Sequence, residues 1–230
     1  MKDNLISIRG DILEKLQNVF KDKAIESHVF GSIARGDTDA YSDIDIWFTF
    51  NDDEFDEIYK NRFHYYSLVG ELLHICEPPQ NAPIGGVHSA LFIKTNSNVI
   101  SVVDVYLCPH STSFITKEAK KLFGINLPLA EIGFNPQKVT VDKNYRIDFF
   151  IGFIFGTIKK LARVESAPLD AVFREYENLY KNYNIAVEPL TVEEQNFNAL
   201  EGIIENTMNI ANEKQKEVLV EIRDFGRRVL

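Results

Sequence analysis

Two aspartates, Asp43 and Asp45, stand two residues apart in a segment of alternating polar and apolar residues, 43–50. Because side chains alternate across a strand, this spacing places both carboxylates on one face and Ile44 on the other. Paired carboxylate oxygens suit Mg²⁺, which binds one or two carboxylates together with the phosphate oxygens of a substrate. The pair therefore predicts a metal site for phosphoryl chemistry.

A Gly-Ser turn precedes the aspartate pair. Gly31 and Ser32 follow the apolar residues 29–30 and lead towards Arg35. A strand that ends in Gly-Ser and turns into a short helix offers free backbone N–H groups, glycine permits close approach, and the serine hydroxyl adds a donor. The turn therefore predicts a phosphate-binding site. For Arg35 two interpretations stay open, a phosphate contact or an ion pair with Asp37 or Asp39.

A third acid, Asp104, interrupts the apolar run Val99–Leu107. An unpaired charge in such a run is costly, so it requires a partner or a metal. If this strand neighbours the strand of Asp43 and Asp45, three carboxylates converge beside the Gly-Ser turn, as in two-metal phosphoryl transfer. Each feature alone has an ordinary structural explanation, and it is their order and spacing that favour a site.

Taken together, the Gly-Ser turn, the Asp-x-Asp pair and the later Asp104 resemble the DNA-polymerase-β-like nucleotidyltransferase superfamily over about residues 28–107. The helical continuation resembles the antibiotic nucleotidyltransferases, which adenylylate hydroxyls of aminoglycosides or lincosamides. The resemblance implies Mg²⁺ at Asp43 and Asp45 and the triphosphate of ATP at the Gly-Ser turn. It implies a role for Asp104 as third metal ligand or as base for the attacking hydroxyl.

One departure concerns the first helix of the second domain, where some aminoglycoside enzymes carry a catalytic Glu. The corresponding segment here, Asp148–Lys160, contains no Glu. Either Asp104 performs the proton transfer or the acceptor differs. Lys159 and Lys160 end this segment, and we expect them to neutralise phosphate charge across a cleft between the two domains.

The pattern of strands and helices predicts an α+β fold. Period-two and apolar runs predict strands in the first half, at residues 29–30, 43–50, 72–76, 87–93 and 99–107. Helices are expected at about residues 4–20, 53–69 and 111–123. The fold class follows as a nucleotidyltransferase mixed-sheet domain over residues 1–130.

After about residue 140 the pattern becomes helical. Residues 145–162 are apolar almost all round, as in a helix buried in a bundle. Ser166 before a proline suits a helix start, and Thr191-x-x-Glu194 has capping-box spacing. A last amphipathic helix is expected at about residues 213–228. We therefore predict an all-α helical-bundle domain over residues 131–230.

Composition limits the partners. The 230 residues include 25 Lys and Arg against 34 Asp and Glu, a net charge of −9. This balance argues against nucleic acid and favours a small, cationic hydroxyl acceptor. We predict a cytoplasmic protein without a membrane span, because the sequence has two isolated cysteines, no signal-peptide core and no apolar stretch of ~20 residues. Monomer and homodimer both stay open.

These observations lead to one hypothesis and two alternatives. The hypothesis is an ATP- and Mg²⁺-dependent nucleotidyltransferase that moves a nucleoside monophosphate to a small-molecule hydroxyl and releases pyrophosphate. One alternative is a protein-AMPylating enzyme of the antitoxin type, although the extra helical residues argue against a minimal catalytic domain. The other is a nucleotide-binding module without catalysis. The presence of all three acids, Asp43, Asp45 and Asp104, argues against this alternative.

Overall fold

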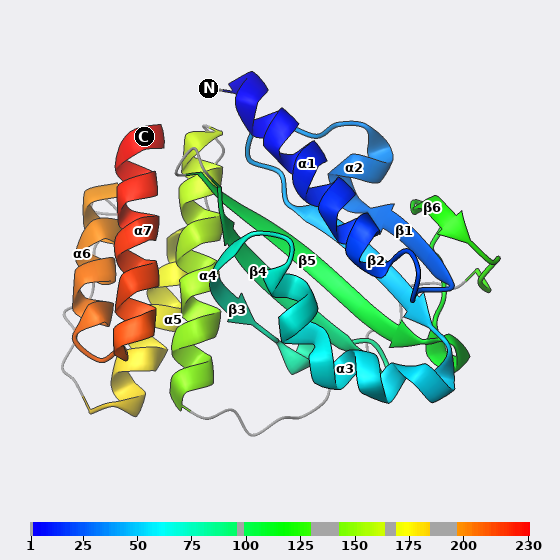
Figure 1. Cartoon of the computed structure of the whole chain (residues 1–230). Helices are drawn as coiled ribbons and strands as arrows, with labels where there is room; N and C mark the ends of the chain where they lie inside the picture. The colour runs from blue at the N-terminus through cyan, green and yellow to red at the C-terminus, as the bar shows by residue number, and fades with distance from the viewer. Residues whose placement is uncertain (1, 96–98, 130–142, 164–168, 185–196) are drawn as a thin grey trace. The chain divides into compact units, whose positions relative to one another are not determined.

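The structure, a computed structural model, describes residues 2–95, 99–129, 143–163, 169–184 and 197–230 (Figure 1). The chain forms two compact units, Met1–Val139 and Thr140–Leu230. The first combines a mixed sheet with helices and the second is helical, which confirms the predicted α+β class. The predicted domain boundary, between residues 130 and 131, lies outside the described residues.

The first unit is built on a six-stranded sheet with the order β3-β4-β5-β2-β1-β6. Its strands are β1 (Glu26–Phe30), β2 (Ile44–Phe50), β3 (Glu71–Cys76), β4 (Val87–Lys94), β5 (Ile100–Pro109) and β6 (Lys120–Gly124). β2 and β5 pair in parallel, and the other neighbours pair antiparallel. A parallel pair needs a long crossover, which is supplied here by the helix, strands and turns between β2 and β5.

Two long helices, α1 (Lys2–Phe20) and α3 (Asp52–Ser67), pack on one face of the sheet (Figure 1). The strands turn alternate residues towards them, so that Ile44, Ile46 and Phe48 are fully buried in the core. Phe20 of α1 packs against Phe48, with 4.7 Å between ring centroids. The residues between these apolar positions, including Asp45, therefore face the opposite side of the sheet.

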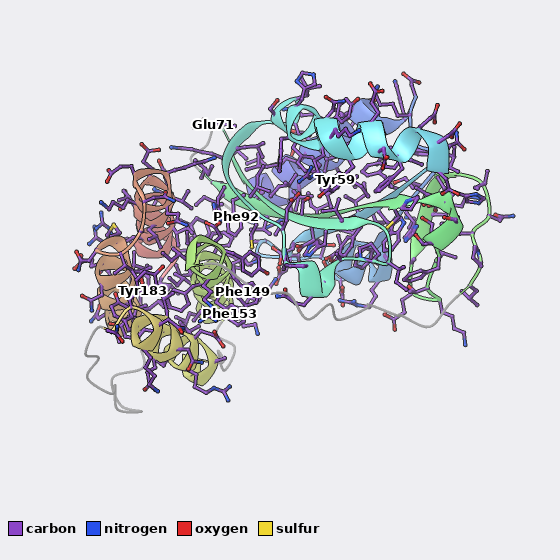
Figure 2. The ribbon with its side chains drawn as sticks, turned by 90° about the horizontal axis from the view of Figure 1, so that it is seen from below. Tyr59, Glu71, Phe92, Phe149, Phe153 and Tyr183 are labelled. Carbon is purple, nitrogen blue, oxygen red and sulfur yellow. The ribbon has the colours of Figure 1, made fainter. Side chains whose placement is uncertain are left out.

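The second unit contains α4 (Lys143–Ala162), α5 (Leu169–Asn182), α6 (Phe197–Met208) and α7 (Glu213–Val229). α4 packs against the other three, and α7 also packs against α6. Asn212 and Gln215 form a reciprocal capping box at the start of α7, and the Gln215 amide donates to Asp148 of α4 at 2.8 Å. Figure 2 shows Phe149 and Phe153 of α4, whose ring centroids are 4.9 Å apart.

The helix predicted at residues 111–123 is wrong. The structure has a short 3₁₀ turn, η2 (His110–Thr112), and then β6. β6 pairs with β1 at the edge of the sheet, where Gly124 lies opposite Glu26, and this pairing outweighs the local helical pattern. The helix starts predicted at Ser166 and at residues 191–194 lie outside the described residues.

The other predicted elements agree with the structure, usually within two or three residues. β1 is longer than predicted, and β2 begins at Ile44, so Asp43 directly precedes the strand instead of lying within it. Within the described part of the chain, no helix combines the length and apolar character that a membrane span needs.

Candidate active site

The Gly-Ser turn lies where β1 ends. Phe30 is the last residue of β1, and the short helix α2 (Gly31–Arg35) starts at the next residue, as predicted. Gly31 has φ +63°, and a Cβ atom there would lie 2.1 Å from Oδ2 of Asp45. Only glycine fits this position, because any side chain would both strain the backbone and overlap the carboxylate. The turn and the second aspartate are therefore in direct contact.

Asp45 and Asp104 are register partners on the parallel strands β2 and β5. Both carboxylates lie on the sheet face opposite α1 and α3, and both residues are half-buried. Asp43, also half-buried, precedes β2 by one residue. The strand pairing thus brings Asp104 next to an aspartate 59 positions earlier in the chain.

The two aspartates belong to a row across the sheet that we call the carboxylate row: Ala90, Asp104, Asp45 and Phe30, from β4, β5, β2 and β1. Phe30 leads directly into Gly31, so the phosphate-type turn continues this row. At the other end, Ala90 lies directly opposite Asp104. Its methyl group is small, which leaves room above the carboxylate for a side chain from a neighbouring position.

That neighbouring side chain is His88 of β4. Its Nε2 lies 2.7 Å from Oδ1 of Asp104, in hydrogen-bonding contact. The imidazole is buried, at 4% side-chain exposure, whereas the Asp104 carboxylate keeps 21%. Nδ1 of His88 is buried and has no hydrogen-bond partner among the described residues. This arrangement favours the tautomer with the proton on Nε2, so that the imidazole donates to the carboxylate.

A second row of side chains lies beside the carboxylate row, two residues along each strand. This ring row consists of His88, Tyr106, Trp47 and His28, which are register partners on β4, β5, β2 and β1. Their rings stack in sequence, with centroid distances of 4.4, 5.5 and 5.6 Å and interplanar angles of 12°, 9° and 18°. The four rings therefore form a continuous stack across four strands.

Both ends of the ring row carry a histidine–carboxylate contact. At the far end Nδ1 of His28 lies 3.0 Å from Oε1 of Glu26, and both side chains are almost fully buried. Thr49 also donates to this carboxylate, at 3.2 Å.

Burial raises the pKa of the Tyr106 hydroxyl, and the negative charges of Asp104 and Asp45 raise it further. Tyr106 is therefore neutral at physiological pH beside the carboxylate row.

The remaining predicted residues have different surroundings. Ser32 is half-buried in α2, beside Gly31. The exposed side chain of Arg35 pairs with Asp37 at 3.1 Å, which is one of the two interpretations left open. Lys159 and Lys160 belong to the last turn of α4 in the helical unit. Lys159 is buried, with its ammonium 5.3 Å from the centroid of the Phe155 ring, and Lys160 is half-buried.

The carboxylates suit a hard divalent cation. Among the residues that the structure describes, no three His, Cys, Asp or Glu side chains are grouped so that they alone could hold a metal. Mg²⁺ does not require such a group, because it is usually held by one or two carboxylates together with substrate phosphates and water. Asp45 and its neighbours offer oxygen donors, and the missing Cβ of Gly31 leaves space at Oδ2 of Asp45. The residues present therefore fit Mg²⁺.

His88, Trp47 and Tyr106 were not among the site residues predicted from the sequence. A single histidine in the apolar run 87–93 carries no spacing signal. Its contact with Asp104 depends on the register between β4 and β5, which the sequence pattern does not specify. The alternation along residues 43–50 does place Trp47 on the same face as Asp45, and that was the available signal.

Residues 11–79 match the family described as nucleotidyltransferase domain, and this range is under a third of the chain. The match includes the Gly-Ser turn and the Asp-x-Asp pair and ends before Asp104. No curated protein sequence matches. The chain therefore contains a nucleotidyltransferase domain and is a nucleotidyltransferase, in agreement with the DNA-polymerase-β-like superfamily that its motifs resemble.

Two solved structures show a limited similarity to this chain. The STING-associated CdnE c-di-GMP synthase from Capnocytophaga granulosa is 16% identical with a TM-score of 0.34, over 99% of this chain and 82% of the synthase. The Elizabethkingia meningoseptica CdnE cyclic dinucleotide synthase, determined with GTP and Apcpp, is 15% identical with a TM-score of 0.28, over 94% and 87%. Similarity at this level does not carry an activity from one protein to another.

Proposed function

We propose that this chain is a Mg²⁺-dependent adenylyltransferase that transfers AMP from ATP to a hydroxyl group of a small molecule and releases pyrophosphate. The observation that carries the proposal is the carboxylate row. Asp45 and Asp104 are register partners on parallel strands, and the backbone of Gly31 touches the Asp45 carboxylate. Phosphate-binding backbone and metal-binding oxygens are therefore adjacent, as transfer from a nucleoside triphosphate requires.

Each residue has a distinct part in this proposal. Gly31 and Ser32 bind the triphosphate through backbone N–H groups and the serine hydroxyl. Asp43 and Asp45 hold Mg²⁺, with Asp104 as a third ligand or as the base for the acceptor hydroxyl. When bound, the metal neutralises phosphate charge and stabilises the attacking and leaving oxygens. Arg35 pairs with Asp37, and a triphosphate bound at the turn would compete with Asp37 for the guanidinium.

The reaction exchanges a phosphoanhydride bond for a phosphoester bond. The acceptor hydroxyl oxygen forms a bond to the α-phosphorus of ATP, and the bond from that phosphorus to the bridging oxygen of pyrophosphate breaks. Pyrophosphate leaves with the electron pair. The hydroxyl proton passes to Asp104 if this carboxylate acts as base, or otherwise to water. The half-exposed position of Asp104 leaves it accessible for either role.

Two further residues of this proposal, Lys159 and Lys160, belong to α4 of the helical unit. Lys159 and Lys160 would neutralise negative charge on the triphosphate. Lys159 is buried beside Phe155, whereas Lys160 is half-buried and therefore more accessible to a ligand. Substituting each lysine by Gln should raise the KM for ATP if the proposal is correct.

The class of acceptor is proposed from the net charge of the chain. A net charge of −9 favours a cationic molecule over nucleic acid, and hydroxyl-rich cations include the aminoglycosides. Aminoglycoside- and lincosamide-type antibiotics are therefore the first acceptors to test. Because Asp148–Lys160 contains no Glu, either Asp104 performs the proton transfer or the acceptor differs from that of the aminoglycoside enzymes.

The experiment is an acceptor screen with labelled ATP and Mg²⁺. The panel contains aminoglycosides, lincosamides, unlabelled nucleotides and bacterial lysate, and both pyrophosphate release and the position of the label are measured. Asp45→Asn is the inactive reference, and Asp53→Asn, an exposed carboxylate in α3, is the matched control. Label on an antibiotic, lost only in Asp45→Asn, supports the proposal.

Other results would contradict it in part or as a whole. Label on protein would favour the AMPylating alternative, and label on a nucleotide would replace the acceptor but keep nucleotidyl transfer. No pyrophosphate release with any acceptor would favour a nucleotide-binding module without catalysis.

A further inference from the structure

We infer that His88 is a positioning residue for Asp104: its Nε2–H fixes the carboxylate of Asp104 in the orientation in which that carboxylate serves the metal or the acceptor hydroxyl. This inference rests on the proposed function, because it assumes that Asp104 takes part in the site. It adds a residue that neither the sequence motif nor the family match, which ends at residue 79, contains.

The first observation is the contact itself. Nε2 of His88 and Oδ1 of Asp104 are 2.7 Å apart, a short distance for a nitrogen–oxygen hydrogen bond. Nδ1 has no hydrogen-bond partner in the described part of the chain, so the imidazole has one polar contact and it is with this carboxylate. A carboxylate held at Oδ1 loses its free rotation, and Oδ2 becomes the oxygen presented to a ligand.

The second observation is that the imidazole cannot turn away. Its ring stacks on Tyr106 at 4.4 Å and 12°, and Tyr106 stacks in turn on Trp47. His88 and Tyr106 are register partners on β4 and β5, so backbone pairing holds the two rings together. With 4% of its side chain exposed, His88 is packed on all sides. The ring row therefore sets the direction of the Nε2–H bond.

The third observation comes from the position opposite Asp104. The register partner of Asp104 on β4 is Ala90, which has no polar group and little volume. Diagonal neighbours in an antiparallel pair are within reach of long side chains, and His88 takes this diagonal position. The combination of a small residue opposite and a histidine on the diagonal gives Asp104 a fixed donor while one side of the carboxylate stays open.

Carboxylates that bind metals are commonly held by hydrogen bonds of this kind, and loss of the supporting donor typically costs about 10- to 100-fold in metal affinity or activity. A purely structural histidine would instead affect only folding stability. The chain contains a matched example for comparison, because His28 stands at the other end of the same ring row and contacts the buried carboxylate of Glu26.

The test measures metal binding without turnover. Mn²⁺ is titrated by electron paramagnetic resonance into the protein with an α,β-methylene analogue of ATP, whose nucleoside monophosphate cannot be transferred. His88→Leu removes the donor, and His88→Gln restores an N–H at the distance of Nε2. His28→Leu is the control for damage to the ring row, and urea unfolding of every variant reports stability.

We expect His88→Leu to weaken Mn²⁺ binding about tenfold or more, and His88→Gln to stay within about threefold of the unchanged protein. His28→Leu should lower stability and leave Mn²⁺ binding unchanged. If His88→Leu does not fold, His88→Asn, whose amide is too short to reach Asp104, takes its place against His88→Gln with the same expectation.

The inference is overturned if the His88 variants bind Mn²⁺ like the unchanged protein, or if His28→Leu weakens binding as much as His88→Leu. Asp45→Asn separates this failure from failure of the proposed function. If Asp45→Asn abolishes Mn²⁺ binding while His88→Leu does not weaken it, only the role of His88 is wrong. If Asp45→Asn also binds normally, the metal site itself is wrong.

Discussion

Gly31 and Asp45 are in contact so close that a Cβ atom on residue 31 would lie 2.1 Å from the carboxylate oxygen Oδ2. The contact follows from the antiparallel pairing of β1 and β2, which places Phe30 opposite Asp45. The turn after β1 then directs the backbone of Gly31, at φ +63°, across the carboxylate. A triphosphate bound by the turn would therefore lie beside a carboxylate that can hold its metal.

Gly31→Ala should disrupt this contact. The methyl group would overlap Asp45 and force residue 31 into a backbone conformation that is costly for alanine, about 1–3 kcal/mol of unfolding free energy. The displaced carboxylate and turn should also lose affinity for ATP in the presence of Mg²⁺. Urea unfolding and calorimetric titration with a non-transferable ATP analogue measure the two effects.

Gly36→Ala is the matched control. Gly36 also has positive φ, +79°, but a Cβ atom there meets nothing within 4 Å. This variant should lose about 1–2 kcal/mol from backbone strain alone and bind the ATP analogue normally. Normal binding by Gly31→Ala as well would contradict the proposed role of the turn.

Trp47→Ala should reveal how much the ring row contributes to stability. Trp47 is 3% exposed and stacks between His28 and Tyr106, with Phe114 5.1 Å from its ring. Removing a buried aromatic ring leaves a cavity, and we expect a loss of about 3–5 kcal/mol in unfolding free energy, with a smaller loss for Trp47→Phe. Urea unfolding followed by circular dichroism measures both. Equal stability of Trp47→Ala and the unchanged protein would show that the row is not tightly packed.

Asp52 should make stability depend on pH in the acidic range. Its carboxylate accepts a hydrogen bond from the backbone N–H of Ser111 at 3.0 Å, and this contact holds its pKa below the ordinary value of 3.8. A lowered pKa means that the folded state favours the ionised form. The stabilisation is therefore complete above the ordinary pKa and is lost as pH falls through the lower, folded-state pKa.

We expect Asp52→Asn to be less stable than the unchanged protein at pH 7, with the difference shrinking as pH falls below 3.8. Urea unfolding at several pH values measures this. Asp53→Asn, in the same first turn of α3, removes a charge without touching Ser111 and should show a weaker pH dependence. A stability difference for Asp52→Asn that is constant with pH would contradict the assignment.

The sequence indicated much of the site because its signals are local. Gly31-Ser32 and Asp43-x-Asp45 lie within fifteen residues, and strand periodicity alone places the two aspartates and Ile44 on opposite faces. The change from strand-type to helix-type pattern likewise predicted the fold class. A strand that is buried on one face has an apolar residue at every second position, whereas a buried helix is apolar almost all round.

The rest depends on pairing between distant strands. The neighbour relation between Asp45 and Asp104 requires β2 and β5 to pair in parallel, which no local pattern encodes. The same holds for His88, because its contact with Asp104 depends on its diagonal position on the neighbouring strand. Residues 120–123 were predicted as part of a helix because local pattern was the only guide, whereas β1 needed a partner at its free edge.

The most direct test of the central claim is Mg²⁺-dependent release of pyrophosphate from ATP, compared between the unchanged protein, Asp45→Asn, Asp104→Asn and the Asp53→Asn control. The reaction is measured with the acceptor that the screen identifies, and unfolding curves verify that the variants fold. We predict that the Asp45 and Asp104 variants lose at least about 100-fold in rate while Asp53→Asn keeps the full rate, because removing electrostatic stabilisation from a reacting centre typically costs about 10²–10³. Full activity in folded Asp45→Asn would contradict the claim that the carboxylate row is the active site.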